Sequence, residues 1–284
     1  MFEFKLENES GNIVDINDNI NYIVIPPVSG LTPPSASLFT SKSPNRKGSK
    51  YNGSTLNERS IVITVKILGD VEENRNALYA WIDTEQYVKV YYRNGVKNVY
   101  CEGYVEECDI DLFTDNEVIS LAIICPDPYW KDLRDISIDI SELKKQFVFP
   151  FAIDSEGVPL STISTLAENS IYYEGAETGI KIAAFFREET TDFAITDVKD
   201  ATRTFKLKRT FEANELLIID TESSPKTCKV VKTDGTTENA LKYVEGKPTW
   251  FTLKKGYNYF SYSANPTIDN VDVTIAFTNK YLGV

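Results

Sequence analysis

The residues best suited to chemistry are six acidic side chains within a stretch of twelve positions. They are Glu106, Glu107, Asp109, Asp111, Asp115 and Glu117. Two carboxylates that flank a sugar bond are the machinery of a glycosidase. On an extended chain, however, the acids alternate with Cys108, Ile110 and Leu112, which is the pattern of a strand with one face in water. We therefore expect a half-solvated strand here and assign no catalytic residues.

Other kinds of chemistry lack the residues they need. The sequence contains no histidine, which removes Ser-His-Asp and Cys-His nucleophile pairs and His-ligated metals. It contains no phosphate-binding, dinucleotide-binding or metalloprotease motif, and Asp15–Asn19 departs from a calcium loop because Ile20 stands where the sharp turn needs glycine. The cysteines are Cys101, Cys108, Cys125 and Cys228, and no CxxC pair occurs among them. We expect buried free thiols, no metal, no cofactor and no enzymatic activity.

Binding is a better prospect than catalysis, and a basic run is the first candidate. It lies in a Pro-, Ser- and Gly-rich segment from Pro26 to Ser60 that shows no periodicity, and such long irregular segments are commonly functional or disordered. The run consists of Lys42, Arg46, Lys47 and Lys50, with no acid among them, and Arg59 follows near the end of the segment. It is either a solvated loop or a surface that docks on an acidic neighbour, including a second copy of this chain.

Aromatic residues of the second half are the other candidate for binding. They include Tyr172, Tyr173, Phe185, Phe186, Trp250, Tyr257, Tyr259 and Tyr262. Rings held on a rigid sheet can stack on carbohydrate, and Tyr172, Tyr173 and Trp250 are the candidate contacts. The competing interpretation, which we favour for any single ring, is that alternate aromatics fill the core of the domain.

Composition and charge narrow the class of protein. The formal net charge of −12 disfavours nonspecific binding to nucleic acid, which clustered Lys and Arg would promote. The first residues do not resemble a signal peptide, and no uninterrupted apolar stretch of about 18 residues occurs, so we expect a protein made in the cytoplasm with no membrane span. A chain of 284 residues with 12% aromatics is long enough for two β-rich domains.

Local patterns predict the elements of the first half. The segments FEFKL and IVDI indicate a hairpin, and Ile61–Ile67 alternates as a strand with one buried face. Asp70 with Glu73 three residues later predicts the start of a helix over the run VEENRNALYAWI. The dipeptide Asn94-Gly95 between two β-rich runs predicts a hairpin with a type I′ turn.

The stretch CPDPYWK, Cys125 to Lys131, predicts the end of the first domain. Two prolines stop a strand ladder, and Tyr129 and Trp130 are expected to pack over the base of the domain, so that Trp130 is largely buried. The predicted division is an N-terminal domain over residues 1–133, a linker over 134–160 and a C-terminal β-sandwich over 161–284, built from about eight short strands.

The order of these features resembles the distal tail proteins of bacteriophages. The resemblance rests on LNERSIVITVKI, VEENRNALYAWI, VKVYYRNGVKNVYCEGYVEEC and CPDPYWKDL in the first half, with basic residues at Arg59 and Arg75 where the family leads us to expect them. It continues with FPFAIDSEGVPLS, YYEGAETGIKI, KKGYNYFSYSA and YLGV in the second half. The segment from Pro26 to Ser60 departs most freely from the family pattern.

The resemblance implies a mainly β fold and a structural role. The expected fold is a belt-type β-sandwich with one helix and a β-hairpin, followed by a galectin-like β-sandwich. Six copies would form a ring at the distal tail or baseplate of the virion, joining the tail tube protein to the tail hub or the host-recognition apparatus, with the tape-measure protein in the channel. The alternative is a carbohydrate-binding module that recognises host cell-wall polysaccharide.

Overall fold

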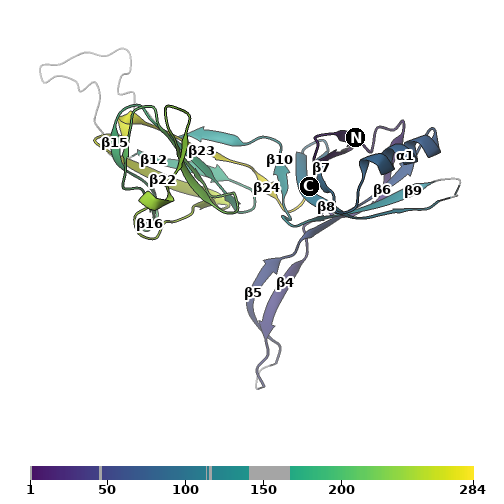
Figure 1. Cartoon of the computed structure of the whole chain (residues 1–284). Coiled ribbons are helices and arrows are strands. Elements are labelled where there is room, and N and C mark those ends of the chain that lie inside the picture. The colour runs from purple at the N-terminus through teal and green to yellow at the C-terminus, as the bar shows by residue number, and fades with distance from the viewer. Residues whose placement is uncertain (1, 45–46, 113, 115–116, 141–166) are drawn as a thin grey trace, which may run out of the picture. The chain divides into compact units, whose positions relative to one another are not determined.

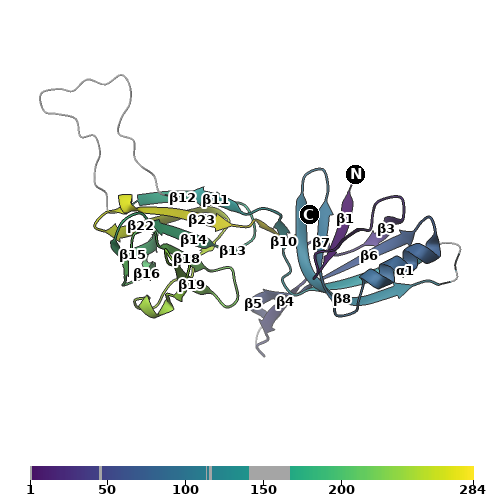
Figure 2. The same ribbon diagram turned by 45° about the horizontal axis from the view of Figure 1, so that its top comes forward.

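The computed structural model describes residues 2–44, 47–112, 114, 117–140 and 167–284, and the chain divides into two compact units. The first unit contains Met1–Leu133 and Lys280–Val284, and the second contains Arg134–Asn279. Figures 1 and 2 show that both units are built from strands, with one α-helix in the first. The predicted mainly β class is confirmed.

A long strand organises the first unit. The strands and helix of this unit are β1 (Glu3–Asn8), β2 (Ile13–Asp15), β3 (Tyr22–Val28), β4 (Ala36–Ser41), β5 (Lys50–Leu56), β6 (Arg59–Ile67), α1 (Val71–Trp81), β7 (Tyr87–Arg93), β8 (Asn98–Ile110), β9 (Val118–Cys125), β10 (Trp130–Asp132) and β24 (Lys280–Tyr281). The first part of β8 pairs with β7 and β10, and its last part pairs with β9, with a register shift between Val105 and Glu107. The sheet runs β2-β1-β7-β8-β9-β6-β3, and this change of partner along β8 curls it.

The curled sheet encloses the first core. Alternate residues of β6, namely Ile61, Ile63, Val65 and Ile67, are at most 2% exposed, as the period of two predicted. The edge strand β3 is joined to the far end of the sheet through Asn17, whose side chain donates to the Phe2 carbonyl at 2.9 Å and accepts from the Val24 amide at 2.9 Å. The Asn17 side chain therefore bridges β3 and the segment that leads into β1.

Helix α1 begins where its capping residue predicted. The Asp70 carboxylate accepts a hydrogen bond from the Glu73 amide at 3.1 Å, and Leu78 is buried against the sheet. The predicted hairpin of β1 and β2 is also confirmed.

The hairpin of β7 and β8 is confirmed, but the predicted turn type is wrong. A type I′ turn needs positive φ at both central residues, and neither Asn94 nor Gly95 has one. The loop instead spans Asn94 to Lys97, and the Asn94 side chain accepts from the Val96 and Lys97 amides at 2.8 and 2.7 Å. The asparagine side chain shapes the turn together with the backbone, since the Asn94 amide donates to the Lys97 carbonyl at 2.9 Å.

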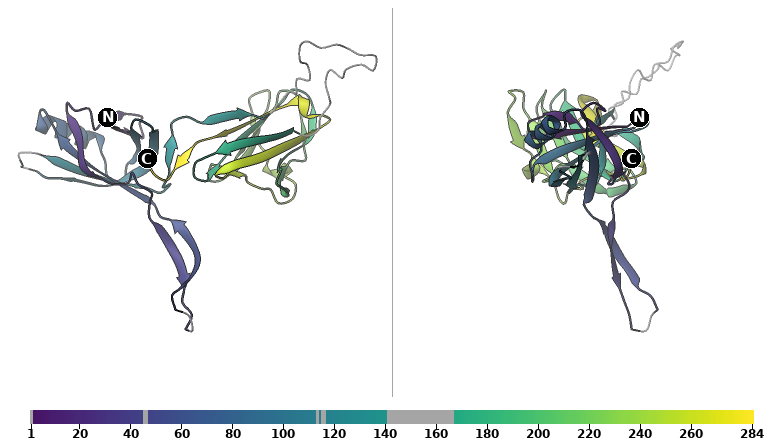
Figure 3. Two further views of the ribbon diagram at one scale, coloured as in Figure 1. Left: turned by 180° about the vertical axis from the view of Figure 1, so that it is seen from behind. Right: turned by 90° about the vertical axis from the view of Figure 1, so that its right-hand side faces the viewer.

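The segment from Pro26 to Ser60 is not irregular throughout. Strands β4 and β5 pair as a separate two-stranded sheet, which we call the arm, and Figures 1 and 3 show it leaving the rest of the first unit. Every residue of β4 is exposed. With neither face of the hairpin buried, the sequence has no reason to alternate, so the periodicity that marks other strands is missing here.

The second unit is a sandwich of two main sheets. Its elements are β11 (Ile136–Asp139), β12 (Ala167–Tyr173), β13 (Thr178–Gly179), β14 (Lys181–Phe186), β15 (Thr190–Asp197), β16 (Asp200–Lys206), β17 (Thr210–Phe211), β18 (Leu216–Asp220), β19 (Thr227–Val231), β20 (Thr237–Asn239), η1 (Leu241–Tyr243), β21 (Thr252–Leu253), β22 (Gly256–Asn265), η2 (Ile268–Asn270) and β23 (Val271–Phe277). One sheet runs β11-β23-β14-β18-β19-β20 and the other β12-β22-β15-β16, with β17 paired to β15. A single apolar cluster that includes Phe186, Phe193 and Phe260 lies between them.

Two predicted boundaries are corrected by strand pairing. Residues 134–140, assigned to a linker, include β11, which pairs with β23 of the second unit, while 141–160 lie outside the described residues. Residues 280–284, assigned to the second domain, belong to the first unit, because β24 pairs with β10. Neither short strand could be assigned from its own sequence, since the partner of β11 lies about 140 positions away along the chain and that of β24 about 150.

Strands β8 and β9 approach each other closely at Gly103, and a substitution there tests the packing of the curled sheet. A Cβ atom there would lie 2.5 Å from the Ile124 carbonyl oxygen and 2.8 Å from Cys125 Sγ. We predict that Gly103→Ala lowers the free energy of unfolding by about 1–3 kcal/mol in urea denaturation, because the strands must separate. Gly95→Ala is the control, since nothing lies within 4 Å of its Cβ position. Equal stability of the two variants would contradict this packing.

Candidate functional site

The acidic run of β8 does not assemble a pair of catalytic carboxylates. Glu106, Glu107, Asp109 and Asp111 are all exposed, as expected of a half-solvated strand. Glu117 is separate from them in function, because its carboxylate accepts two hydrogen bonds from Arg75, at 2.6 and 2.7 Å, and this contact raises the pKa of Arg75. Asp115 lies outside the described residues.

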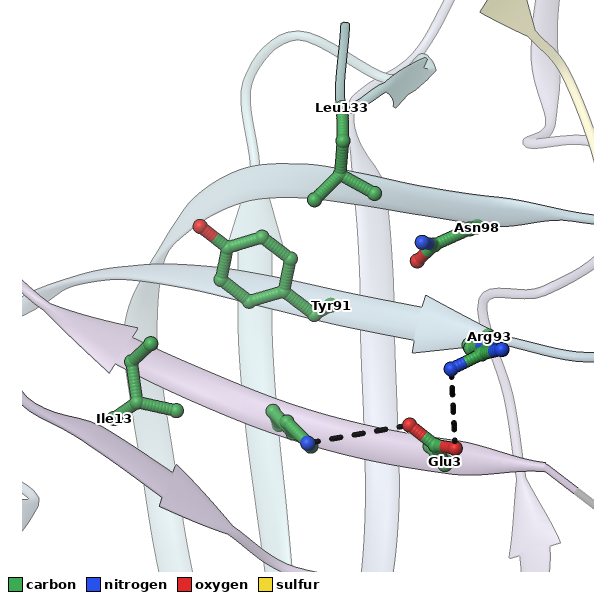
Figure 4. Close-up of a pocket in the computed structure, with 7 residues that line it drawn as sticks. Glu3, Ile13, Tyr91, Arg93, Asn98 and Leu133 are labelled. Atoms are coloured by element: carbon green, nitrogen blue, oxygen red, sulfur yellow. Dashed lines mark ion pairs between the residues drawn. The ribbon is translucent and has the colours of Figure 1, made fainter.

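Two cavities lined by described residues of the first unit hold either paired charges or a largely apolar lining. Figure 4 shows one of about 230 Å³ over β1 and β7, where Glu3 pairs with both Lys5 and Arg93. Tyr91, which lines the same cavity, donates a hydrogen bond to Glu7. The pKa of Tyr91 is raised, mainly by burial and secondly by this hydrogen bond. Each charged side chain that lines this cavity therefore has an ion-pair partner. A second cavity, of about 220 Å³, has a largely apolar lining that includes Phe2, Val24 and Leu31.

The cysteines behave as buried thiols over the part of the chain that the structure describes. All four are free, and Cys101, Cys125 and Cys228 are at most 1% exposed. Burial raises the pKa of Cys228 to about 12, which keeps it protonated at neutral pH. Among the described residues, no group of three or more His, Cys, Asp or Glu side chains could hold a metal ion, and no helix is long and apolar enough to cross a membrane.

Arg59 is not part of an exposed basic loop, which corrects its grouping with the lysines. It begins β6 and is only 1% exposed. Its guanidinium donates to the carbonyls of Pro128 at 2.8 Å, Thr32 at 2.8 Å and Leu282 at 2.6 Å, and also to that of Gly30. Burial lowers the pKa of Arg59, yet four carbonyl partners satisfy its charge. We call this arrangement the Arg59 clamp.

The CPDPYWK stretch is a structural element next to the Arg59 clamp. Trp130 is fully buried, as predicted, and its ring lies 5.6 Å from the Arg59 guanidinium carbon. Lys131 pairs with Asp127 at 2.8 Å and with Glu102 at 3.0 Å. Burial alone would lower the pKa of Lys131, but these two carboxylates raise it. The stretch therefore fixes the base of the unit and offers no ligand site.

The remaining basic residues lie on the arm. Lys42 follows β4, Lys47 lies in the loop and Lys50 begins β5, and all three are exposed, while Arg46 is outside the described residues. Three large apolar side chains of the arm are exposed as well: Leu38 at 65%, Phe39 at 55% and Tyr51 at 60%. Sequence reasoning missed these apolar residues, although their isolation among Ser, Thr and Asn was a signal that they had no core to enter.

The three aromatics proposed to contact sugar do not share a surface. Tyr172 is 56% exposed, whereas Tyr173 is buried against Phe277 and Trp250 packs on Phe205 with a ring separation of 5.1 Å. Adjacent positions on β12 point to opposite faces, which explains the different fates of Tyr172 and Tyr173.

Tyr172 has other aromatic neighbours, which the sequence did not single out as its partners. Its ring lies 5.0 Å from that of Tyr257, which is 60% exposed, and Tyr259 lies 6.1 Å beyond. Lys199 Nζ stands 4.3 Å from the Tyr259 ring. We call Tyr172, Tyr257 and Tyr259 the tyrosine face. Cross-strand register brings these rings together, and register is not visible in either strand alone.

Two protein-family models match this chain, one in each unit. The model described as "Phage tail protein RIFT-related domain" matches residues 16–125, and the model described as "Siphovirus-type tail component, C-terminal domain" matches residues 175–281. The matches between them cover most of the chain, and they define a two-domain β protein of a phage tail. The chain belongs to the siphovirus-type tail components, the family of phage distal tail proteins. No curated protein sequence matched it.

Solved structures share the fold at low sequence identity. The crystal structure of the SPP1 Dit (gp 19.1) protein, described as a paradigm of the hub adsorption apparatus in phages that infect Gram-positive bacteria, is 15% identical with a TM-score of 0.71, covering 98% of this chain and 99% of that one. A chain of the phage P2 baseplate in its activated conformation with Ca is 12% identical with a TM-score of 0.54, and one with Sr is 13% identical with a TM-score of 0.53. Both of these cover 100% of each chain.

The Arg59 clamp gives the prediction of this section. Arg59→Met keeps much of the apolar volume but removes a donor from four carbonyls, of which that of Gly30 keeps the Trp130 indole N–H at 3.3 Å, so we expect a loss of at least about 3 kcal/mol in the free energy of unfolding. Arg59→Lys should lose less, because an ammonium retains three donors without the planar fork. Urea denaturation of the full chain measures both values. Wild-type stability of Arg59→Met would show that the clamp does not hold the unit together.

Proposed function

We propose that six copies of this chain form a ring at the distal end of the phage tail, which joins the tail tube protein to the tail hub. The chain is a structural component of the tail and its adsorption apparatus. The number six and the position between tube and hub come from the resemblance to distal tail proteins. The virion tail is the proposed location, and the tape-measure protein would pass through the channel of the ring.

The observation that carries the proposal is the arm. An isolated two-stranded hairpin is marginally stable in water, because it buries too little apolar surface. The arm is anchored at its base, where the Asn57 amide donates to the Ser35 carbonyl at 3.0 Å and the two side chains also hydrogen-bond. Farther out, Leu38, Phe39 and Tyr51 face solvent. An arm of this kind is suited to wrapping a neighbouring subunit.

A ring also agrees with the remaining physical properties. When the arm of one subunit binds a different surface of the next, the contact is head-to-tail, and such contacts form a closed ring when the rotation between neighbours closes. An acidic chain with net charge −12 would let DNA pass through the channel without adhering. A non-enzymatic role agrees with the absence of histidine from the sequence and with the solvent exposure of the β8 carboxylates.

A second candidate function is the binding of host cell-wall polysaccharide by the second unit. The tyrosine face favours it, since Tyr172 and Tyr257 are more than half exposed and lie on one side of a rigid sheet. Tyr173 and Trp250 do not take part in this proposal, because their rings are committed to the core or packed against it.

Replacing the exposed apolar residues of the arm tests the ring. We predict that Leu38→Ser, Phe39→Ser and Tyr51→Ser together weaken subunit association by at least about 4 kcal/mol, or roughly 1000-fold, because three buried anchors are lost. Analytical ultracentrifugation and native mass spectrometry would show a shift from six copies to one. The control changes Ile13, Ile20 and Val96 to serine, since these residues are apolar, belong to the same unit and are 60–88% exposed. Wild-type protein that stays monomeric even with its tube and hub partners would contradict the ring.

Replacing the tyrosines tests the second function. If the tyrosine face binds polysaccharide, Tyr172→Ala and Tyr257→Ala should each reduce affinity by roughly five- to ten-fold, because each removes one stacking ring. Titration with purified host wall polysaccharide measures this, and Tyr79→Ala, an exposed tyrosine of the first unit, is the control. Unchanged affinity in both variants would exclude the tyrosine face as the binding site.

A further inference from the structure

Two hairpins of the first unit carry opposite charge. The arm, from Ala36 to Asn57, contains basic residues and no Asp or Glu. The end of β8 and the residues that follow it contain the exposed acids Glu106, Glu107, Asp109 and Asp111, and no Lys or Arg occurs between Asn98 and Trp130. Charge in this unit is therefore segregated onto separate elements.

Neither set of charges forms an ion pair within the described part of its own chain. Among the described residues, the ion pairs include none of Lys42, Lys47 and Lys50, and none of the four exposed acids of β8. Nearby charges that serve the fold do have partners, as Glu102 has Lys131 and Glu117 has Arg75. The unpaired charges are thus distinct from the structural ion pairs of the unit.

The bulge in β8 increases the number of acids that face solvent. Strict alternation would send one of two adjacent residues inward, but the register shift between Val105 and Glu107 leaves both Glu106 and Glu107 exposed. Tyr104 and Leu112 flank the acids and are 49% and 44% exposed. The surface made by Tyr104, Glu106, Glu107, Asp109, Asp111 and Leu112, which we call the acidic strand end, offers both charge and apolar area.

The two elements of one subunit point in different directions. Figures 1 and 3 show the arm leaving the sheet on one side, while β8 and β9 extend beside α1 on another. The basic arm therefore does not lie on the acidic strand end of its own chain. A second copy can supply the missing partner, as a head-to-tail contact requires two different patches on one subunit.

We propose that the acidic strand end is the surface on which the arm of the next subunit docks. This inference rests on the proposed ring and names the acceptor within it. Lysines of the arm face the four acids, while Leu38, Phe39 and Tyr51 cover Tyr104 and Leu112 and supply most of the affinity. Charge complementarity sets the orientation and speeds encounter. Since the whole chain carries a net charge of −12, other contacts between copies are repelled, which favours this one.

Charge reversal with rescue tests the acceptor. The arm-reversed protein carries Lys42→Glu, Lys47→Glu and Lys50→Glu, and the acceptor-reversed protein carries Glu106→Lys, Glu107→Lys and Asp109→Lys. Each alone should need at least a ten-fold higher concentration to assemble, measured by analytical ultracentrifugation, because like charges then meet at every contact. Mixed in equal amounts, the two should assemble again, since each arm finds an acceptor of opposite charge on the other protein. The alternating ring closes because six is even, and native mass spectrometry should find three copies of each.

A matched control separates local contact from total charge. Glu188→Lys, Glu189→Lys and Glu212→Lys change the net charge by the same amount as acceptor reversal, but at exposed positions of the second unit. This variant should assemble like the wild type, and circular dichroism should show that all variants are folded.

The outcomes distinguish the acceptor from the ring. If wild-type rings form and the acceptor-reversed protein assembles equally well, or if the mixture of reversed proteins stays monomeric, the acidic strand end is not the acceptor while the ring stands. If the wild type forms no ring with its tube and hub partners, the proposed ring is wrong, and the proposed acceptor surface is wrong with it.

Discussion

The hydrogen bonding of Arg59 is the constraint on which the rest of the first unit depends. One guanidinium holds carbonyls at Gly30 and Thr32, at Pro128 and at Leu282, which belong to three segments far apart in the sequence. Burying a charge is costly unless hydrogen bonds compensate for the lost hydration, and here four of the five N–H donors of the guanidinium have a carbonyl partner. Because Gly30 and Thr32 lie directly before β4, the clamp fixes the point from which the arm leaves. The direction of an exposed element is thus set by an interaction in the interior.

Much of the fold follows from local sequence, and the exceptions have physical causes. Strand β6 could be predicted because one-sided burial produces the alternation of Ile61, Ile63, Val65 and Ile67. Helix α1 could be predicted because its capping hydrogen bond joins Asp70 to a residue only three positions later. The arm could not be predicted, because a hairpin that is exposed on both faces has no alternating apolar pattern in its sequence. The short strands β11 and β24 are defined by partners remote in sequence. Strand β11 has four residues and β24 has two, which is too few to specify the pairing from local sequence.

The candidate surfaces were predicted in part, for the same reason. A cluster of charges is visible in a sequence, and this identified Lys42, Lys47 and Lys50. The burial of Arg59 is not visible in a sequence, and for that reason Arg59 was grouped with the lysines. Tyr172 was found, but its neighbours Tyr257 and Tyr259 join it through the register of β12 and β22. Composition identifies which residue types are available, and tertiary structure decides which of them meet. The assembly of opposite charges on two hairpins combines both, since each set is local while their separation is a property of the fold.

The return of the chain through β24 has a consequence for the order of synthesis. The second unit, Arg134–Asn279, is inserted into the first, whose strand β24 and clamp partner Leu282 come later in the sequence. A ribosome therefore produces the entire inserted unit before the first unit can complete its sheet. The same arrangement makes the insert a cassette, because the strands before and after it, β10 and β24, are antiparallel neighbours. Sequence change within the cassette can alter the surface of the second unit while the first unit keeps its own core.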